Sequence, residues 1–484
     1  MAITVEVGLL SGRTAAVTAD VDEGVETLRL RALSLLGVSK GQLLDSSGGI
    51  LDGSSRIKRA RVQNGDSLTV LISKTEVCST KYAFAAIVGD ASVATWGDGD
   101  TGGRSRDVQK QLRNVKKIQS SRFAFAAILV DGSVLTWGRP YYGGNCHVVR
   151  KVLKRVQHIQ SSHGAFAAIL GDGSVATWGH SGSGGDSRVV REQLKNVQHI
   201  QSSEHAFAAI LCDGSVVSWG CTEHGGDSGS VQHQLKNVQQ VQSTSRAFAA
   251  ILGNGSVVTW GDRACGGDSS AVQDRLKSVQ QIQASERAFA AIIADGSVVT
   301  WGDALYGGDS SAVHDQLKTV QQIQATSYAF AAVLVGGSVV TWGHCTRGGD
   351  GSNVQHQLKN VQNIAATTDA FAAVLEDGSV VTWGHAQNGG DSSAVQQQLK
   401  NVQHIHAADA AFAAILASGS VVSWGSAQFG GDSTAVQEEL KNVLQIQASD
   451  YAFAAIRSNG TVVTWGRREC GGDSRAVHEQ LRNA

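Results

Sequence analysis

The sequence of 484 residues has little proline, methionine or charge: one proline, one methionine and 17% charged residues. Its formal net charge of −1 provides no field of one sign that would attract nucleic acid or an anionic membrane. No apolar run reaches the about 18 residues of a membrane-spanning helix, and the start, MAITVEVGLLSGR, lacks the pattern of a secretory signal. The seven cysteines show no CxxC spacing, which indicates a reducing compartment. We therefore expect a cytoplasmic protein, with the nucleus as the alternative, and neither nucleic acid nor membrane as a partner.

Tryptophan, by contrast, is abundant and evenly spaced. The ten tryptophans lie 41 residues apart, from Trp96 to Trp465, and a Phe-Ala-Ala motif begins 12 positions before each of them. Gly follows every Trp, and a Gly-Gly pair stands six and seven positions after it. Residues 75–484 therefore hold ten units of 41 residues, which is typical of a repeat architecture.

Each unit contains three segments with strand character. In the unit that includes Ile282 they are IQAS, AFAAII and SVVTWG, and Asp-Gly joins the second to the third as in a β-hairpin. After the Gly-Gly pair, Val313, Leu317 and Val320 have helical spacing, with Asp309 or Ser310 as the cap. The sequence predicts an amphipathic helical turn here, and a fourth, irregular strand is the alternative.

Units of about 40 residues with three or four short strands are typical of β-propeller blades, with Phe and Trp as the core. The segment DGSVVTWG and the Gly-rich stretch after it resemble the regulator of chromosome condensation repeat family, and the resemblance covers residues 75–484. The units are shorter and more numerous than is usual in that family. A ten-bladed ring, a seven-bladed ring with extra units and an open superhelix therefore all remain open. In a closed ring we expect the strand at Val77-Cys78-Ser79 to complete the last blade.

Residues 1–73 lack the repeat. The sequence predicts strands at 3–7 and 14–18, a helix over 23–36, short apolar pieces at 42–44 and 50–51, and a closing strand within 62–72. We place Val25, Leu28, Ala32 and Leu35 on the buried face of the helix.

This order of elements, and above all VQNGDSLTVLI, resembles ubiquitin-like domains of the β-grasp fold. The chain runs on into the first repeat without a Gly-Gly tail, so the resemblance implies an integral domain. The recognition patch of ubiquitin corresponds to Leu10, Asp45 and Leu71, and a slip of one residue would put Leu44 in the place of Asp45. The expected fold class is thus mainly β: an α/β ubiquitin-like domain at 1–73 and a propeller-type array of ten units at 75–484.

The sequence shows no catalytic or cofactor-binding constellation. The close histidine groupings, His404 with His406 and His344 with Cys345, lack the further ligands of a metal site. The glycine pairs match no phosphate-binding motif. We therefore expect no catalytic residue, no cofactor and no metal.

The informative variation lies in two loops of each unit: three residues before Ala-Phe, and four residues between Trp-Gly and Gly-Gly. Because consecutive antiparallel strands reverse direction, both loops emerge at one end, opposite the constant Asp-Gly turns. The sequence variation at this end indicates a binding surface, because loops on a rigid scaffold often carry the residues that recognise a partner. Neutral sequence drift in solvent-exposed loops is an equal alternative. The candidate partner-binding residues are Arg139, Tyr141, Tyr142, His180, Glu223, His224, Arg263, Tyr306, His344, Arg347, His385, Phe429, Arg467 and Arg468.

The combination of the two domains is similar to HERC-type proteins. It implies a non-catalytic scaffold whose repeat array binds a protein partner and whose ubiquitin-like domain links that partner to the ubiquitin system. The sequence contains no HECT domain, so we expect no ligase activity of its own, although the resemblance would suggest that label. The alternative is a guanine-nucleotide exchange factor for a small GTPase, which the same repeat family contains.

Overall fold

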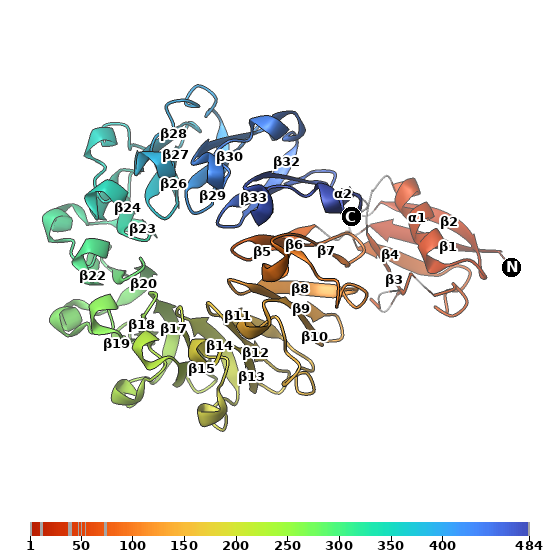
Figure 1. Cartoon of the computed structure of the whole chain (residues 1–484), viewed down its shortest axis with the longest axis horizontal. Helices are drawn as coiled ribbons and strands as arrows, with labels where there is room; N and C mark the ends of the chain where they lie inside the picture. The colour runs from red at the N-terminus through yellow and green to blue at the C-terminus, as the bar shows by residue number, and fades with distance from the viewer. Residues whose placement is uncertain are drawn as a thin grey trace.

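The structure is a computed structural model that describes residues 2–9, 13–36, 41–46, 48–49, 51–53, 55–71 and 75–482. Its N-terminal part is a four-stranded mixed sheet with one helix, and Figure 1 shows it outside a ring of small sheets. The elements are β1 (Ala2–Leu9), β2 (Thr14–Asp20), α1 (Val25–Leu36), β3 (Gln42–Leu44) and β4 (Ser67–Leu71). The strand order is β2-β1-β4-β3, with β1 antiparallel to β2 and parallel to β4.

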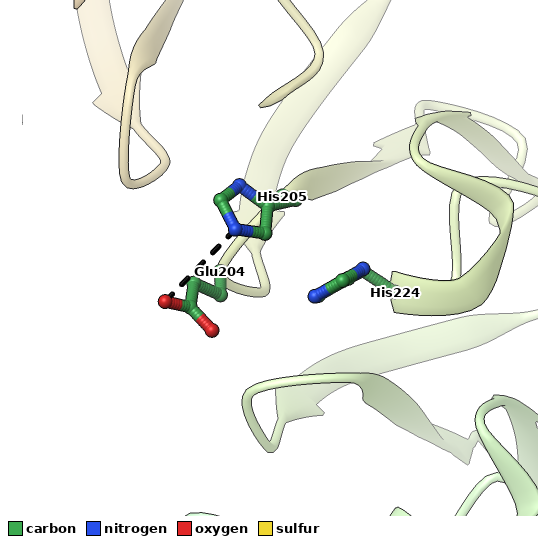
Figure 2. Close-up of side chains that lie close together, drawn as sticks. All are labelled: Glu204, His205 and His224. Atoms are coloured by element: carbon green, nitrogen blue, oxygen red, sulfur yellow. Dashed lines mark ion pairs between the residues drawn. The ribbon is translucent and has the colours of Figure 1, made fainter. Parts of the chain in front are cut away.

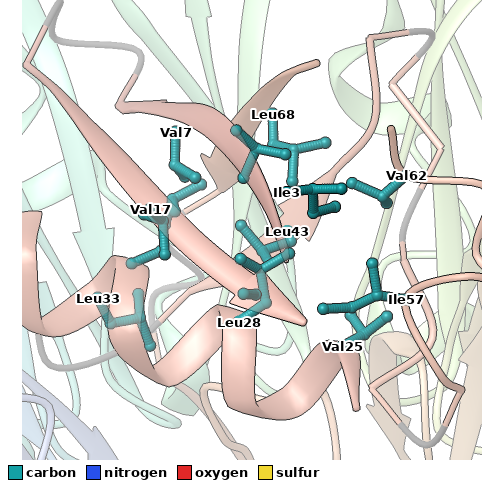
Figure 3. Close-up of a cluster of buried hydrophobic side chains, with 14 of the residues drawn as sticks. Ile3, Val7, Val17, Val25, Leu28, Leu33, Leu43, Ile57, Val62 and Leu68 are labelled. Carbon is teal, nitrogen blue, oxygen red and sulfur yellow. The ribbon is translucent and has the colours of Figure 1, made fainter. Parts of the chain in front are cut away.

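Alternating burial along β1 creates the core of this part, because every second side chain points toward α1. Val7, Leu28 and Leu43 are among the side chains packed together there (Figure 3). The helix buries Val25, Leu28, Ala32, Leu33 and Leu36. Our placement of Leu35 on the buried face was wrong: it is 57% exposed, since eleven residues make about three full turns and bring Leu36 rather than Leu35 under Val25. The predicted piece at 50–51 is not a strand at Leu51, and Ile50 lies outside the described residues.

Over residues 75–482 the structure describes ten three-stranded antiparallel sheets, one for each 41-residue unit, and we number them as blades 1 to 10 in chain order. Blades 1 to 5 are β5–β6–β7 (Glu76–Ser79, Ala83–Ile87, Val93–Gly97), β8–β9–β10 (Val115–Ser120, Ala124–Leu129, Val134–Gly138), β11–β12–β13 (His158–Ser161, Ala165–Ile169, Val175–Gly179), β14–β15–β16 (Val197–Ser202, Ala206–Leu211, Val216–Gly220) and β17–β18–β19 (Val238–Ser243, Ala247–Leu252, Val257–Gly261). Blades 6 to 10 are β20–β21–β22 (Val279–Ala284, Ala288–Ile293, Val298–Gly302), β23–β24–β25 (Val320–Ala325, Ala329–Leu334, Val339–Gly343), β26–β27–β28 (Val361–Ala366, Ala370–Leu375, Val380–Gly384), β29–β30–β31 (Val402–Ala407, Ala411–Leu416, Val421–Gly425) and β32–β33–β34 (Val443–Ala448, Ala452–Arg457, Val462–Gly466). The protein is thus mainly β and a repeat propeller, as predicted.

The repeated Phe and Trp join neighbouring blades. In blade 6, Phe289 pairs with Trp301 across the sheet and their rings stack with centroids 5.1 Å apart. The indole Nε1 of Trp301 donates a hydrogen bond of 3.0 Å to the carbonyl of Gly266 in the preceding unit. Gly266 has φ +93°, and a Cβ there would lie 2.6 Å from the ring of Phe289. Only glycine fits, so Trp, Phe and the first Gly of each pair form one interlocking contact.

The same contact closes the ring between the last and the first unit. Trp96 of blade 1 donates to the carbonyl of Gly471 at 3.0 Å, and Leu481 packs in one cluster with Phe84 and Trp96. The first strands contact each other around the centre, including β32 with β5. Figure 1 shows the C-terminal helix α2 (His478–Arg482) beside blade 1. The described units therefore form one ten-bladed ring.

Our expectation that the strand at Val77-Cys78-Ser79 completes the last blade was wrong. This strand, β5, pairs with β6 of its own sheet, with Glu76 opposite Ile87. Each unit keeps its three strands and extends its last segment over the next blade. The C-terminal segment therefore closes the ring by packing on the first blade.

The segment after the Gly-Gly pair is a short helix in seven of the ten units and a series of turns in the other three. In one unit it spans Ser311–Gln316 with 3₁₀ geometry, and Leu317 behind it is buried. Asp309 accepts a hydrogen bond from the backbone N–H of Ser311 at 2.8 Å. The helical prediction is confirmed for this segment, and the part of the chain that the structure describes shows no fourth strand in the sheets. Val320, which we placed on the helical face, begins β23 instead.

The constant Asp-Gly turns lie at the other end of the blades and bind the neighbouring blade. Asp295 accepts from the N–H of Ser297 at 2.9 Å, and Gly296 adopts φ +80°. The carbonyl of Gly296 accepts from the N–H of Val320, the first residue of the next blade, at 2.8 Å. No described helix is long and apolar enough to cross a membrane.

Candidate functional site: the loop end of the ring

The two variable loops of each unit meet at one end of the ring. We call the three residues before the middle strand the inner loop and the four residues after the third strand the outer loop. In blade 2 the backbone N–H of Arg139 in the outer loop donates to the carbonyl of Phe123 in the inner loop at 3.0 Å. Corresponding bonds join the two loops of the other blades, for example Cys221 to His205. Backbone atoms alone make this contact, so the loops share one surface whatever their side chains.

A chain of backbone hydrogen bonds also runs from blade to blade around the central opening. The N–H of Lys81 donates to the carbonyl of Arg122, that of Arg122 to His163, and that of His163 to Glu204. The series continues through corresponding residues of the later blades to a bond from Asp409 to Asp450. The inner loops border a cavity of about 1060 Å³ at this end of the ring. Their middle side chains surround the opening.

The charges at this opening are grouped. Lys81 in blade 1 forms an ion pair of 3.0 Å with Asp450 in blade 10, and the side chain of Lys81 is only 12% exposed. Burial, and next the charge of Asp450, raises the pKa of the Asp409 carboxyl to about 7. Asp409 and Asp450 stand on neighbouring blades, so the two acids and one buried cation make up one electrostatic group.

Aromatic side chains of the loops form a continuous row over six blades. Phe429 stacks on Tyr451 with ring centroids 4.7 Å apart, and Tyr451 stacks on Tyr82 at 5.4 Å across the closure of the ring. The row, which we call the aromatic arc, passes from blade 9 through blades 10, 1, 2 and 3 to blade 4. Its members are Phe429, Tyr451, Tyr82, Phe123, Tyr142, His163, His205 and His224.

Cations stand over several rings of the arc. The guanidinium of Arg139 lies 5.0 Å from the centroid of Phe123, and that of Arg467 lies 5.6 Å from Tyr451. Lys81 Nζ lies 5.6 Å from the ring centroids of both Tyr82 and Tyr451. Aromatic rings and arginine are the residue types that contribute most to protein interfaces. The arc therefore has the chemical composition of a binding surface.

A second, smaller group lies across blades 6 and 7. Tyr306 stacks on Tyr328 with centroids 4.8 Å apart, Arg287 stands over Tyr306 at 4.9 Å, and Arg347 stands over Tyr328 at 4.1 Å. Arg347 also forms an ion pair of 2.8 Å with Asp369 of blade 8. This group is separated from the arc by the loops of blades 5 and 8, whose described side chains contribute no aromatic contact.

The predicted rim residues are distributed over these features. Tyr142, His224 and Phe429 belong to the arc, and Arg139 and Arg467 are its cations; Tyr141 is 65% exposed and its ring meets His180, with centroids 4.6 Å apart. Tyr306, Arg347 and His344 lie in the second group. Arg263 and Arg468 instead form ion pairs with Asp268 and Asp473, and Glu223 and His385 are exposed.

The sequence analysis identified both variable loops but took its candidate residues from the four-residue loops alone, so it missed the inner-loop members of the arc. Tyr82, Phe123, His205 and Tyr451 stand directly before the strands with Ala-Phe, and His163 stands one position earlier, so aligning the ten units in columns would have revealed them. Such an alignment would not have shown that rings on neighbouring blades contact one another.

The structure also brings together a group that we did not expect. Glu204, His205 and His224 each offer one potential metal-ligand atom, and these atoms lie within 4.8 Å of one another. Figure 2 shows the three side chains around one common space. All three belong to blade 4, at the end of the arc.

The three residues of the predicted ubiquitin-like patch are less fully described. Leu10 lies outside the described residues, and for Leu71 only the backbone is described. Asp45 accepts a hydrogen bond from the N–H of Gly49 at 2.9 Å. The sheet face away from α1 exposes Thr4, Glu6 and Thr18, and it also carries the half-buried Leu44, which pairs with Thr69.

No protein-family model and no curated protein sequence matches the chain. Among solved structures, it is similar to the computationally designed protein Ika8, at 14% identity over 64% of this chain and 96% of that chain, with a TM-score of 0.31. It is also similar to Prp20p of Saccharomyces cerevisiae, or yeast RCC1, at 14% identity over 56% of this chain and 82% of that one, with a TM-score of 0.32. Human WBSCR16 matches at 14% identity over 62% of this chain and 83% of that one, with a TM-score of 0.30.

Proposed function

We propose that the protein is a non-catalytic scaffold whose aromatic arc binds a protein partner. The single observation that carries this proposal is the continuity of the arc across blades that are far apart in the sequence. Rings that contact one another in a row, some stacked and some edge to face, with cations over several of them, suit a partner segment that carries aromatic or acidic side chains. The partner gains rigid contact area, because the loops are held by backbone hydrogen bonds and lose little freedom on binding.

The N-terminal domain, in this proposal, links the bound partner to the ubiquitin system. Support comes from the strand order β2-β1-β4-β3 with one helix across the sheet, together with the resemblance of VQNGDSLTVLI to ubiquitin-like sequences. The polar residues Thr4, Glu6 and Thr18 on the open face differ from the apolar patch of ubiquitin itself. We therefore expect this face to select partners through hydrogen bonds more than through apolar docking.

The arc can be tested without disturbing the ring. Phe123→Ala with Tyr142→Ser removes the centre of the arc, and the repeat itself carries Ala410 and Ser183 at the corresponding positions. Asp369→Ala with Asn388→Ser makes the matched change in blade 8. Quantitative affinity capture with the full-length chain should lose specific partners in the first variant and keep them in the second. An identical set of captured proteins for both variants and the parent chain would contradict the proposal.

Two further measurements separate the parts of the proposal. Thr4→Arg with Thr18→Arg should release ubiquitin-system proteins from the captured set while the partners of the arc remain. Release of labelled GDP from a panel of small GTPases tests the alternative function. Acceleration of that release by the protein would replace the scaffold with an exchange factor.

A further inference from the structure

The group at the end of the arc in blade 4 consists of two imidazoles and one carboxylate that face one another. His205 Nε2 lies 4.0 Å from Glu204 Oε1, and the rings of His205 and His224 are 4.6 Å apart and nearly perpendicular. The potential ligand atoms of the three residues lie within 4.8 Å of one another. Figure 2 shows that they converge from the inner and the outer loop of the same blade.

Hydrogen bonds on the far side of each ring fix its orientation. His205 Nδ1 lies 2.9 Å from Ser183 Oγ, and the same hydroxyl lies 3.1 Å from His180 Nδ1. His224 Nδ1 lies 3.2 Å from Cys221 Sγ. When both Nδ1 atoms carry the proton, each Nε2 keeps its lone pair for a ligand. An N–H donated to a second group is the usual arrangement behind a metal-binding histidine.

The charge state of the imidazoles also suits a metal ion. Burial lowers the pKa of both His205 and His224 and so favours their neutral imidazole forms. Arg246 of blade 5 is the nearby cation that also lowers these pKa values. It forms an ion pair with Asp262 at 3.1 Å, which offsets its charge. Neutral imidazole and ionised carboxylate are the forms in which these side chains bind metals.

The backbone holds the two loops in place. Ser203 Oγ donates to the carbonyl of His224 at 2.7 Å, and the N–H of Cys221 donates to the carbonyl of His205 at 3.0 Å. His224 is buried, whereas the side chain of Glu204 is 39% exposed and has room to rotate. Two fixed ligands and one adaptable ligand can therefore close from 4.8 Å to the about 3.4 Å that separates ligands in a tetrahedral zinc site.

We propose that Glu204, His205 and His224 bind one divalent transition-metal ion of the zinc class, through one carboxylate oxygen and two imidazole nitrogens. Three protein ligands leave a fourth position for water or for a group from outside the chain. The imidazoles exclude Mg²⁺ as the preferred ion, because Mg²⁺ prefers oxygen ligands in an octahedral arrangement.

Titration of the full-length protein with Co²⁺ tests the site, because Co²⁺ in a four-coordinate site is intensely coloured. We expect one equivalent of coloured Co²⁺ that Zn²⁺ displaces and excess Mg²⁺ does not. His205→Ala with His224→Asn should remove this equivalent, and it should fold normally because Ala410 and Asn388 stand at the corresponding positions. His344→Ala with His385→Ala is the control, and it should keep the site.

Ser183→Ala provides a second test that leaves all three ligands in place. Loss of the hydroxyl behind His205 should weaken binding by about 10–100-fold, with the stoichiometry unchanged. Absence of tight Co²⁺ binding in the parent, or its persistence in the variant that lacks both histidines, would overturn the proposal.

Discussion

The two ends of the ring are built on similar backbone frames, yet the loop end varies more in sequence than the turn end, where a glycine is kept in nine of the ten turns. At the turn end, a side chain and a special backbone angle support the backbone bond from Val320 to Gly296: Asp295 accepts from Ser297, and Gly296 stands at φ +80° against Thr319. At the loop end, the hydrogen bonds between blades join backbone atoms, such as Lys81 N–H and the Arg122 carbonyl. Most loop side chains are therefore free to change without loss of structure.

A second difference concerns the side chains on the surface of each end. Asn or a similar residue at a positive φ precedes most of the first strands, as at Asn237 and Asn442, and it packs against a turn glycine. This repeated contact gives the turn end much the same surface on every blade. The loop end instead carries the aromatic arc on six blades and the smaller tyrosine group on two. In the proposed function, recognition is thus separated from stability by placing each at its own end.

The largest expected effect comes from a change at the turn end. Gly296→Ala should destabilise the protein by about 1–3 kcal/mol, because alanine is strained at this φ and its Cβ would lie 2.8 Å from the Cα of Thr319. The midpoint of urea unfolding measures the change.

Blade 1 supplies a control of opposite sign, since Ala91 already occupies the corresponding turn position at φ +59°. Ala91→Gly should relieve about 1 kcal/mol of backbone strain. If both substitutions shifted the midpoint in the same direction, backbone strain would not explain the constancy of the turns.

An intermediate effect on stability is expected at the central opening of the loop end, where the carboxyl of Asp409 lies near the charge of Asp450. The pKa of Asp409 is about 7 in the folded chain and near 3.8 when unfolded. The folded chain therefore keeps a proton that the unfolded chain releases, so this residue lowers the free energy of unfolding as pH rises through that range. Asp409→Asn should raise the Tm more at pH 8 than at pH 5.

Ser327→Asn, at the corresponding position of blade 7, is the control for this pH dependence. Its change in Tm should be the same at both pH values, because serine does not titrate there. Equal changes for Asp409→Asn at both pH values would show that its carboxyl titrates normally.

The smallest effect on stability is expected at the loop end. Tyr306→Ser with Tyr328→Ala removes the smaller aromatic group, and Ser183 and Ala410 occupy the corresponding positions elsewhere in the repeat. We expect each change to lower the free energy of unfolding by about 0.5–1 kcal/mol, because both tyrosines are half-buried and Tyr306 packs on the hydrophobic core beneath it. A loss comparable to that of Gly296→Ala would show that the loop end also carries the fold.

Much of the repeat could be predicted from sequence because its determinants are local. The 41-residue period, the pairing of Phe with Trp and the Asp-Gly hairpins all follow from residues within one unit. The size of the ring could not be predicted, since it depends on a small rotation between blades that no single residue encodes. The prediction that the first strand completes the last blade was wrong for a related reason. The end of each unit packs on the next blade, and the 41-residue period alone does not show this.

The candidate site was predicted in part. Antiparallel geometry placed both variable loops at one end, and the backbone bond between Arg139 and Phe123 shows that they meet there. The metal-ligand group was missed because Glu204 and His205 lie in one loop and His224 in the other, outside any familiar spacing. Leu35 was misplaced because it borders the buried face of α1, where one residue changes the side of the helix.

The closure of the ring through Leu481 has a consequence for synthesis on the ribosome. Nine of the ten contacts between blades join units that leave the exit tunnel one after the other, so each can form as soon as its second partner emerges. The contact of Trp96 with Gly471 joins the first unit to the last. During translation Phe84 and Trp96 of blade 1 therefore stay uncovered until the last unit has emerged. A pause or truncation before Leu481 leaves this edge of the ring open to a chaperone or to a second nascent chain.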